Sequence, residues 1–111
     1  MRIKTQDYNT VTVIELQGEL DGEISGVLRN MITDIVSADK DGIVLHVSGV
    51  GFIDSEGLEL LLWAKEYCTE NHCQLRIAGL DENCAKILEI TRLESKFDLY
   101  TELAEAVKSF V

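Results

Sequence analysis

Segments typical of β-strands alternate along this chain with segments typical of amphipathic helices. Residues 10–17 are rich in β-branched side chains and close to alternating in polarity, and residues 43–47 form a short apolar run bounded by turn residues. Between them, apolar residues recur at three- and four-residue steps from Ile24 to Val36, which predicts a helix capped by Asp21. The same order repeats as a helix over 55–71, a strand over 73–78 and a third helix capped by Asp81. Such alternation requires crossover connections, so we expect an α/β fold with a largely parallel sheet.

Weaker patterns extend this arrangement at both ends of the chain. A strand over 3–8, followed by Asn9, predicts a hairpin with the next strand and therefore a mixed sheet edge. A short strand over 97–100 and a last helix capped by Thr101 are expected near the other end, and the glycine-containing stretch 48–54 is expected to form a loop. The resulting prediction is a mixed, mostly parallel sheet of four to five strands with about four α-helices.

Size, charge and cysteine content restrict the possible partners. One domain over residues 1–111 is expected from the length. Twenty acidic residues against ten Lys and Arg give a net charge of −10, which repels nucleic acid and anionic membranes. The longest nearly continuous apolar stretch, 60–64, is too short to span a bilayer, and no targeting segment is recognisable, so direct membrane insertion is not expected. Three cysteines are an odd number and are expected to be reduced, which favours a cytoplasmic location.

The sequence offers no pattern typical of catalysis or of cofactor binding. It has no phosphate-binding glycine loop with a following Lys-Ser or Lys-Thr, and Gly49-Val50-Gly51 lacks the third glycine of a dinucleotide fingerprint. Cys68, His72 and Cys73 match no common zinc spacing, so buried structural thiols are the preferred interpretation. No serine follows the glycine-flanked pattern of a catalytic nucleophile. We therefore expect a protein-binding module with no catalytic residues, no cofactor and no metal.

Residues 52–58, Phe-Ile-Asp-Ser-Glu-Gly-Leu, place Ser55 where a loop is expected to meet the start of an apolar helix. Free backbone N–H groups and the positive end of the helix dipole favour an anion at such a position. A phosphate on Ser55 would be stabilised by these groups. The alternative is an ordinary helix-capping serine, and local chemistry alone favours that alternative.

Three segments in order carry a resemblance to a known family. Residues 18–21 read Gly-Glu-Leu-Asp, residues 50–58 read Val-Gly-Phe-Ile-Asp-Ser-Glu-Gly-Leu, and residues 87–93 read Ile-Leu-Glu-Ile-Thr-Arg-Leu and are followed by Phe97. With these motifs at this spacing, residues 8–110 resemble a STAS domain of the bacterial anti-sigma factor antagonist type. The resemblance implies a four-helix domain on a mixed sheet, in agreement with the pattern of strands and helices.

The resemblance also implies a function in partner switching. An unphosphorylated antagonist of this family binds a cytoplasmic anti-sigma factor that is also an ATP-dependent serine kinase, and the sigma factor is released. The kinase phosphorylates the serine directly after the motif aspartate, which is Ser55 here, and a metal-dependent serine phosphatase reverses the modification. By the same resemblance, the expected partner-binding residues are Asp21, Asp54, Ser55, Glu56 and Gly57.

Two residues depart from the family pattern. Many antagonists carry Ser or Thr at the position of Glu56, and a carboxylate beside Ser55 could hinder the kinase or partly imitate a phosphorylated state. We expect a working switch with altered tuning, because one charge of different geometry is an imperfect mimic of a phosphate. His46 stands where the buried strand often carries Asp or Asn, and could act as a pH-sensitive group near the loop or as a structural residue. The structural role is the expected one.

Two other functions remain as alternatives. A STAS domain can serve as a non-switching accessory subunit of a lipid-transport complex or as a scaffold in a stress-signalling assembly. Such variants often lose the phosphorylatable residue, so the presence of Ser55 argues against this alternative. A small-molecule-binding or catalytic α/β domain would need a pocket lined by convergent polar groups, and the sequence predicts no such set.

Overall fold

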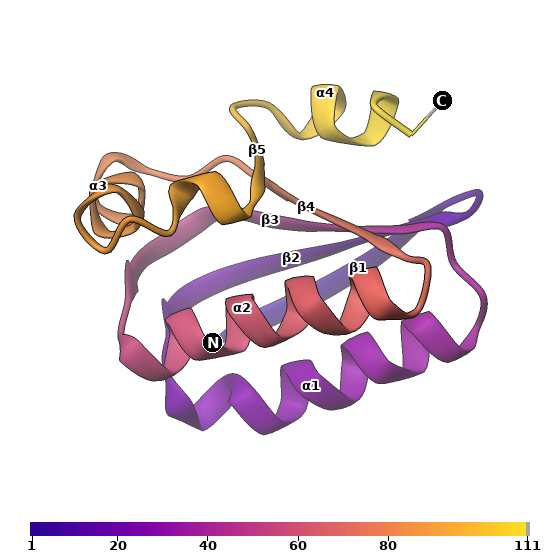
Figure 1. Cartoon of the computed structure of the whole chain (residues 1–111), viewed down its shortest axis with the longest axis horizontal. Helices are drawn as coiled ribbons and strands as arrows, with labels where there is room; N and C mark the ends of the chain where they lie inside the picture. The colour runs from indigo at the N-terminus through magenta and orange to yellow at the C-terminus, as the bar shows by residue number, and fades with distance from the viewer. Residues whose placement is uncertain (111) are drawn as a thin grey trace.

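The computed structural model describes residues 1–110, which form a five-stranded sheet and four α-helices (Figure 1). In chain order the elements are β1 (Arg2–Tyr8), β2 (Val11–Leu20), α1 (Gly22–Ser37), β3 (Gly42–Ile53), α2 (Ser55–Glu70), β4 (Gln74–Ala78), α3 (Glu82–Ile90), the short 3-10 helix η1 (Glu94–Lys96), β5 (Asp98–Tyr100) and α4 (Leu103–Lys108). The strands lie in the order β1-β2-β3-β4-β5, with β1 antiparallel to β2 and all later pairs parallel. The predicted α/β class and mixed, mostly parallel sheet are confirmed.

The predicted hairpin at the start of the chain is also present. Tyr8 pairs with Val11 across the turn, and Asn9 adopts a left-handed conformation with a φ of 56°. Asparagine tolerates this conformation better than most residues because its short polar side chain can hydrogen-bond locally. β1 is thereby fixed as an edge strand that has β2 as its one neighbour in the sheet.

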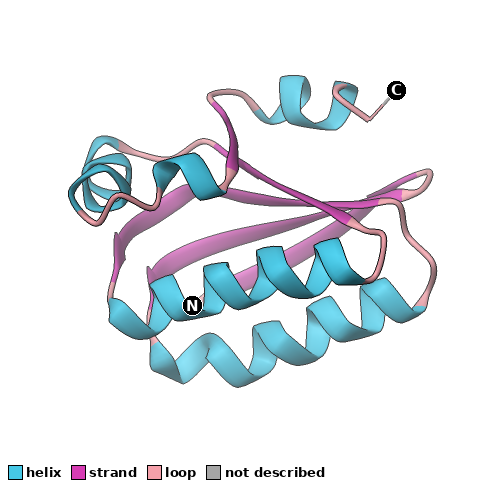
Figure 2. Cartoon of the chain, viewed as in Figure 1, coloured by secondary structure: helices cyan, strands magenta, loops and turns pink. Residues whose placement is uncertain are grey.

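The helices cover the two faces of the sheet unequally (Figure 2). α1 and α2 lie side by side against one face, and the short α4 lies over the other. Along β3, Ile43, Leu45 and Val47 are buried toward α1 and α2, whereas Val44 belongs to the smaller core beneath α4. This alternation follows from the two-residue period of a strand and explains why four of the five residues 43–47, all but His46, are apolar and buried.

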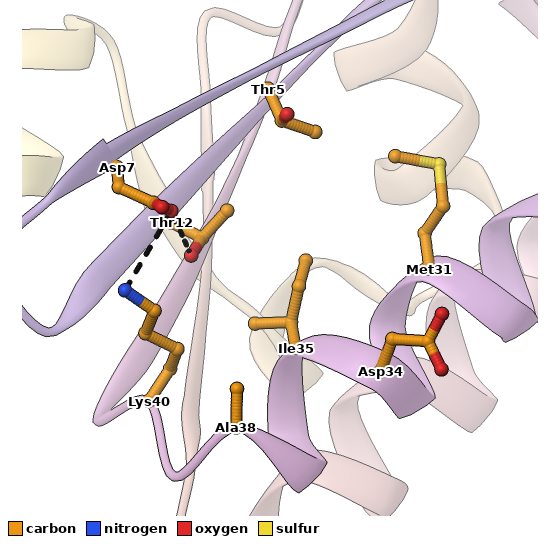
Figure 3. Close-up of a pocket in the computed structure, with 8 residues that line it drawn as sticks. All are labelled: Thr5, Asp7, Thr12, Met31, Asp34, Ile35, Ala38 and Lys40. Carbon is orange, nitrogen blue, oxygen red and sulfur yellow. Dashed lines mark hydrogen bonds and ion pairs between the residues drawn. The ribbon is translucent and has the colours of Figure 1, made fainter.

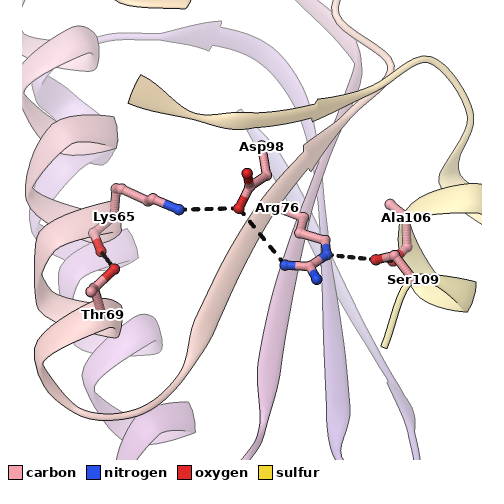
Figure 4. A network of polar contacts seen from close by, with 6 residues as sticks. All are labelled: Lys65, Thr69, Arg76, Asp98, Ala106 and Ser109. Carbon is pink, nitrogen blue, oxygen red and sulfur yellow. Dashed lines mark hydrogen bonds and ion pairs between the residues drawn. The ribbon is translucent and has the colours of Figure 1, made fainter. Parts of the chain in front are cut away.

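Besides the smaller apolar core, a polar network around Arg76 on β4 joins the C-terminal helix to the sheet (Figure 4). The Arg76 guanidinium lies 4.2 Å from the centre of the Phe110 ring, and its Nε donates a hydrogen bond to the Ser109 hydroxyl. On its other side, Arg76 Nη1 lies 3.8 Å from Asp98 Oδ2, and that carboxylate also accepts a hydrogen bond of 3.1 Å from Lys65 Nζ. Arg76 is thus the central residue of a polar network that joins α2, β4, β5 and the C-terminal helix.

Two local predictions were wrong. The stretch 48–54 was expected to be a loop, but β3 continues to Ile53 and pairs with β2 up to Leu20. The last helix was expected to be capped by Thr101, but Glu102 occupies the cap position and makes no side-chain capping bond. Within residues 1–110, no helix is both long and apolar enough to cross a membrane.

Candidate protein-binding site

The site predicted around Ser55 lies at the carboxyl ends of β2 and β3. Leu20 and Ile53 are partners in the parallel ladder, and each is followed directly by an aspartate that begins a helix. The Asp54 N–H donates a hydrogen bond of 3.2 Å to the Leu20 carbonyl, which holds the two strand ends together. The N-termini of α1 and α2 therefore lie next to each other at one end of the molecule (Figure 1).

Asp21 and Asp54 are the N-caps of these two helices. Asp21 Oδ1 accepts a hydrogen bond of 3.0 Å from the Glu23 N–H, and Asp54 Oδ1 accepts one of 2.8 Å from the Gly57 N–H. Each carboxylate satisfies a backbone donor that the helix itself cannot pair, and its charge lies favourably at the positive end of the helix dipole. The predicted cap at Asp21 is confirmed.

Ser55 is the first residue of α2 and is exposed to solvent. Because Asp54 caps the helix, the alternative that Ser55 is an ordinary capping residue is wrong. Among the described residues, the Ser55 hydroxyl takes part in no side-chain hydrogen bond, so it is free to react or to contact a partner. The hydroxyl lies at the start of α2, with one acidic residue directly before it and another directly after it.

Gly57 explains how α2 can begin so close to β2. A Cβ atom at this position would lie 2.3 Å from the Leu20 carbonyl oxygen and 2.9 Å from Ile53 Cγ2, so a side chain has no room. Gly57 is buried accordingly, whereas Ser55 and Glu56 are exposed. The glycine fixes the position of Ser55 relative to Asp21, because it sets the distance between the start of α2 and the end of β2.

Glu56 reaches across to the start of α1. Its carboxylate occupies the space in which a Cβ atom on Gly22 would lie, so the glycine at the first position of α1 accommodates it. The neighbourhood is otherwise acidic, because a hollow of about 330 Å³ beside Asp21 is lined by Glu19 and Glu23 as well. Phe52, at the end of β3, is 49% exposed. The sequence analysis did not identify Phe52, Glu19 or Glu23 as parts of this surface, although Glu19 and Phe52 lie within the motifs that it used and Glu23 follows the first motif by two residues.

The chemistry of this surface is suited to binding a protein. It combines several carboxylates, one exposed aromatic ring and an exposed hydroxyl, which suits a partner with a basic and partly apolar surface. In the part of the chain that the structure describes, no group of three or more His, Cys, Asp or Glu residues could hold a metal ion. His46 lies on the sheet face beneath α4, where its Nε2 is 3.0 Å from the Ser48 hydroxyl and its Nδ1 is 3.6 Å from Glu15 Oε2.

The three cysteines are buried and free, as the sequence analysis predicted. Burial raises the pKa of the Cys84 thiol to about 12, and hydrogen bonding to Asp81 adds to the effect. The Cys84 thiol also donates to the Val50 carbonyl at 3.3 Å. A side-chain hydrogen bond between Cys68 and Cys73 raises the pKa of Cys68 and lowers that of Cys73. Because these groups are shielded from solvent, they pack as small apolar side chains.

Comparisons with known proteins agree with this architecture. A sequence model of the STAS domain matches residues 2–106. The chain is 23% identical over 105 residues to the anti-sigma-F factor antagonist RsfB of Mycobacterium tuberculosis. This alignment covers 95% of this chain and 85% of RsfB. The crystal structure of an anti-sigma factor antagonist from Mycobacterium paratuberculosis is similar, with a TM-score of 0.85, 23% identity and coverage of 97% of this chain and 92% of that one. The Bacillus cell fate determinant SpoIIAA in its phosphorylated form is also similar, with a TM-score of 0.77, 18% identity and coverage of 99% and 100%.

Proposed function

We propose that this chain, which belongs to the STAS domain family, is an anti-sigma factor antagonist that is controlled by phosphorylation of Ser55. The observation that carries the proposal is the position of Ser55, an exposed residue at the start of α2 that is not needed to cap the helix. In this proposal the unphosphorylated protein binds a cytoplasmic anti-sigma factor with serine kinase activity. The kinase binds the ATP and the metal ion, provides the catalytic base and phosphorylates Ser55. A metal-dependent phosphatase then restores the free hydroxyl.

The similar proteins support the two parts of this proposal separately. RsfB is named as an anti-sigma-F factor antagonist and is similar over nearly the whole chain, which supports the class of partner. SpoIIAA is described in a phosphorylated form, which supports the idea that a protein of this fold can carry a phosphate. The partner-binding residues are then Asp21, Asp54, Ser55 and Glu56, with Gly57 holding the helix in position.

Electrostatics explain why a phosphate would release the partner. A phosphoserine adds roughly −1.5 to −2 charges near neutral pH. On Ser55 it would stand beside Asp54 and Glu56, and the Gly57 N–H is already paired with the Asp54 carboxylate. The phosphate would therefore have to be desolvated in the complex among like charges. A loss of about 3 kcal/mol of binding free energy corresponds to a roughly hundredfold weaker complex.

The proposal can be tested with the purified protein, its candidate kinase and ATP, with phosphate mapped by mass spectrometry. We expect one phosphate, on Ser55. A Ser55→Ala variant should take up none and should still bind the unmodified kinase, because alanine removes one neutral hydroxyl and adds neither charge nor bulk to the interface. Ser95→Ala, at another exposed serine, is the matched control and should be phosphorylated normally. Phosphate that persists on the Ser55→Ala variant would show that another residue is the acceptor.

Glu56 supports a second candidate, a non-switching accessory subunit or scaffold. Its carboxylate lies against Gly22, and Glu56 follows Ser55 directly, so the protein carries a negative charge near this hydroxyl before any phosphorylation. If Glu56 blocks the kinase, wild-type protein should bind its partner without being phosphorylated, and Glu56→Ser should acquire a phosphate on Ser55. If Glu56 only tunes the switch, wild type and Glu56→Ser should both be phosphorylated, at different rates.

A further inference from the structure

A groove lies at the far end of α1 from Ser55, between that helix and the edge strand β1 (Figure 3). Its volume is about 340 Å³. Met31, Ile35 and Ala38 form an apolar floor along the last turns of α1, and Thr5 faces them from β1. We call this feature the β1–α1 groove. It is open along its length, so it fits a chain that lies across it better than a ligand that must be enclosed.

One end of the groove is polar but already neutralised. Lys40 Nζ lies 3.7 Å from Asp7 Oδ1 and donates a hydrogen bond of 3.1 Å to the Asn9 carbonyl. The hydroxyl of Thr12, which is 3% exposed, donates to the same Asp7 oxygen at 2.8 Å. The Lys40 ammonium therefore balances the charge of the Asp7 carboxylate, and the hydrogen bond from Thr12 holds that carboxylate in place at the wall of the groove.

The remaining charged residue of the groove is Asp34. It is exposed, and among residues 1–110 its carboxylate has no salt bridge, so the groove carries one uncompensated negative charge. The last turn of α1 contains no basic residue, and the carboxyl end of a helix dipole is itself negative. A cation would therefore be favoured beside the apolar floor.

β1 forms the upper wall of the groove and leaves its outer edge free. All of its residues except Ile3 are exposed, it contains no proline, and β2 is its one neighbour. Edge strands of this kind present unpaired backbone donors and acceptors that can pair with another chain. The side chains of an added strand would point alternately to the two faces of the sheet, and those on the α1 face would lie over the groove.

We propose that the β1–α1 groove binds an extended segment of a partner protein that alternates apolar and basic side chains and adds to the sheet next to β1. Apolar side chains of the segment would lie against Met31 and Ile35, and a basic side chain would pair with Asp34. Charge complementarity decides between the possible occupants. A second copy of this chain would bring another net charge of −10 to a groove that already has an unpaired carboxylate, so it is disfavoured.

The test uses the intact protein and a fluorescent peptide of alternating lysine and valine, with binding followed by anisotropy and mapped by NMR. We expect shifts in the backbone amides of residues 5–8 and in the side-chain methyl groups of Met31 and Ile35. Asp34→Lys should weaken binding about tenfold, because an attraction becomes a repulsion. Glu89→Lys, the same change at an exposed residue of α3, should alter binding less than about twofold.

A second peptide separates strand addition from simple ion pairing. With alternate backbone amides methylated, it keeps its charge but cannot pair as a strand, and it should bind at least about tenfold more weakly. The proposal is overturned if neither peptide binds at 1 mM, if both bind equally, or if the NMR shifts fall only around Ser55. It is also overturned if sedimentation shows that wild-type protein dimerises through β1, because the occupant is then a second copy. The mapping does not depend on phosphorylation, so its outcome is separate from that of the proposed function.

Discussion

Replacing Gly57 by alanine should destabilise the protein and displace Ser55, although alanine is the better helix former. Gly57 lies in the first turn of α2 and is buried against the end of β2. An added Cβ would lie 2.3 Å from the Leu20 carbonyl oxygen, where real Cβ atoms do not come closer than about 3.0 Å. The helix start must therefore retreat by about 0.7 Å from a main-chain atom that cannot rotate away.

The size of the effect follows from two opposing contributions. Forcing a methyl group into a packed contact costs about 1–3 kcal/mol. Alanine in place of glycine within a helix contributes up to about 1 kcal/mol in the opposite direction. We expect a net loss of about 1–2 kcal/mol in the free energy of unfolding. The same retreat lengthens the hydrogen bond from Asp54 N–H to the Leu20 carbonyl, so the start of α2 should become more mobile.

Urea unfolding measures the first effect, and amide hydrogen exchange across residues 54–58 measures the second. Gly26→Ala is the matched control, because Gly26 is an exposed residue of α1 with no atom within 4 Å of an added Cβ. That variant should be more stable than the wild type by up to about 1 kcal/mol. If Gly57→Ala is as stable as Gly26→Ala, the close approach between α2 and β2 is not what requires a glycine.

Three further predictions concern the caps, the C-terminal helix and the buried thiol. Asp54→Ala should lower the free energy of unfolding by about 1 kcal/mol, because the cap of α2 is lost. Asp54→Asn keeps a capping oxygen, so it should cost much less stability while still weakening partner binding. Equal losses for the two variants in urea unfolding would contradict the capping role. Arg76→Ala and Phe110→Ala should each speed amide hydrogen exchange in α4, because each removes the contact between the guanidinium and the ring. A double-mutant cycle on the free energy of unfolding should give a coupling of about 0.5–2 kcal/mol. Additive effects of the two substitutions would show that their contact contributes nothing. The pKa of Cys84 is raised from 9.0 to about 12 in the folded protein, so above pH 9 the thiol ionises more readily in the unfolded state. The free energy of unfolding is therefore highest below pH 9 and falls as the pH rises from 9 toward 12. Between pH 8 and 10 the stability advantage of wild type over Cys84→Ala should shrink by about 1 kcal/mol in urea unfolding, and a constant difference would refute the shift.

The sequence predicted the elements whose side-chain pattern and backbone requirements agree. The helix expected over 55–71 is α2 (Ser55–Glu70), because its apolar spacing defines the buried face; that Asp54 and not Ser55 caps it became evident only in the structure. The run 43–47 lies within β3, and its four apolar residues are buried on both faces, as expected of a central strand; His46 is half-buried. Local patterning placed Ser55 at the start of this helix, but its assignment as the modified residue came from the family resemblance, because local chemistry alone favoured a capping serine.

Features that depend on the packing of distant segments could not be predicted in the same way. Gly49 and Gly51 indicated a loop, but β2 continues alongside and supplies backbone partners, so β3 extends to Ile53. A Cβ on Gly49 would lie 2.8 Å from Gln17 Cγ, so the glycine reflects a crowded neighbouring strand and not a turn. The β1–α1 groove could not be predicted either, because β1 and α1 are separated in the sequence and the apolar spacing of α1 is that of an ordinary amphipathic helix.

The two proposed binding surfaces share α1, and their separation makes their coupling measurable. Asp21 and Asp34 stand near opposite ends of that helix, so at 1.5 Å per residue they are about 20 Å apart. The Debye length at physiological salt is about 8 Å, so a phosphate on Ser55 should be screened from Asp34 and should leave peptide binding in the groove unchanged. If phosphorylation nevertheless weakened binding at the groove, the charge itself could not be the cause. The result would then mean that α1 moves as a unit when Ser55 is modified, because Glu56 rests on the first residue of that helix.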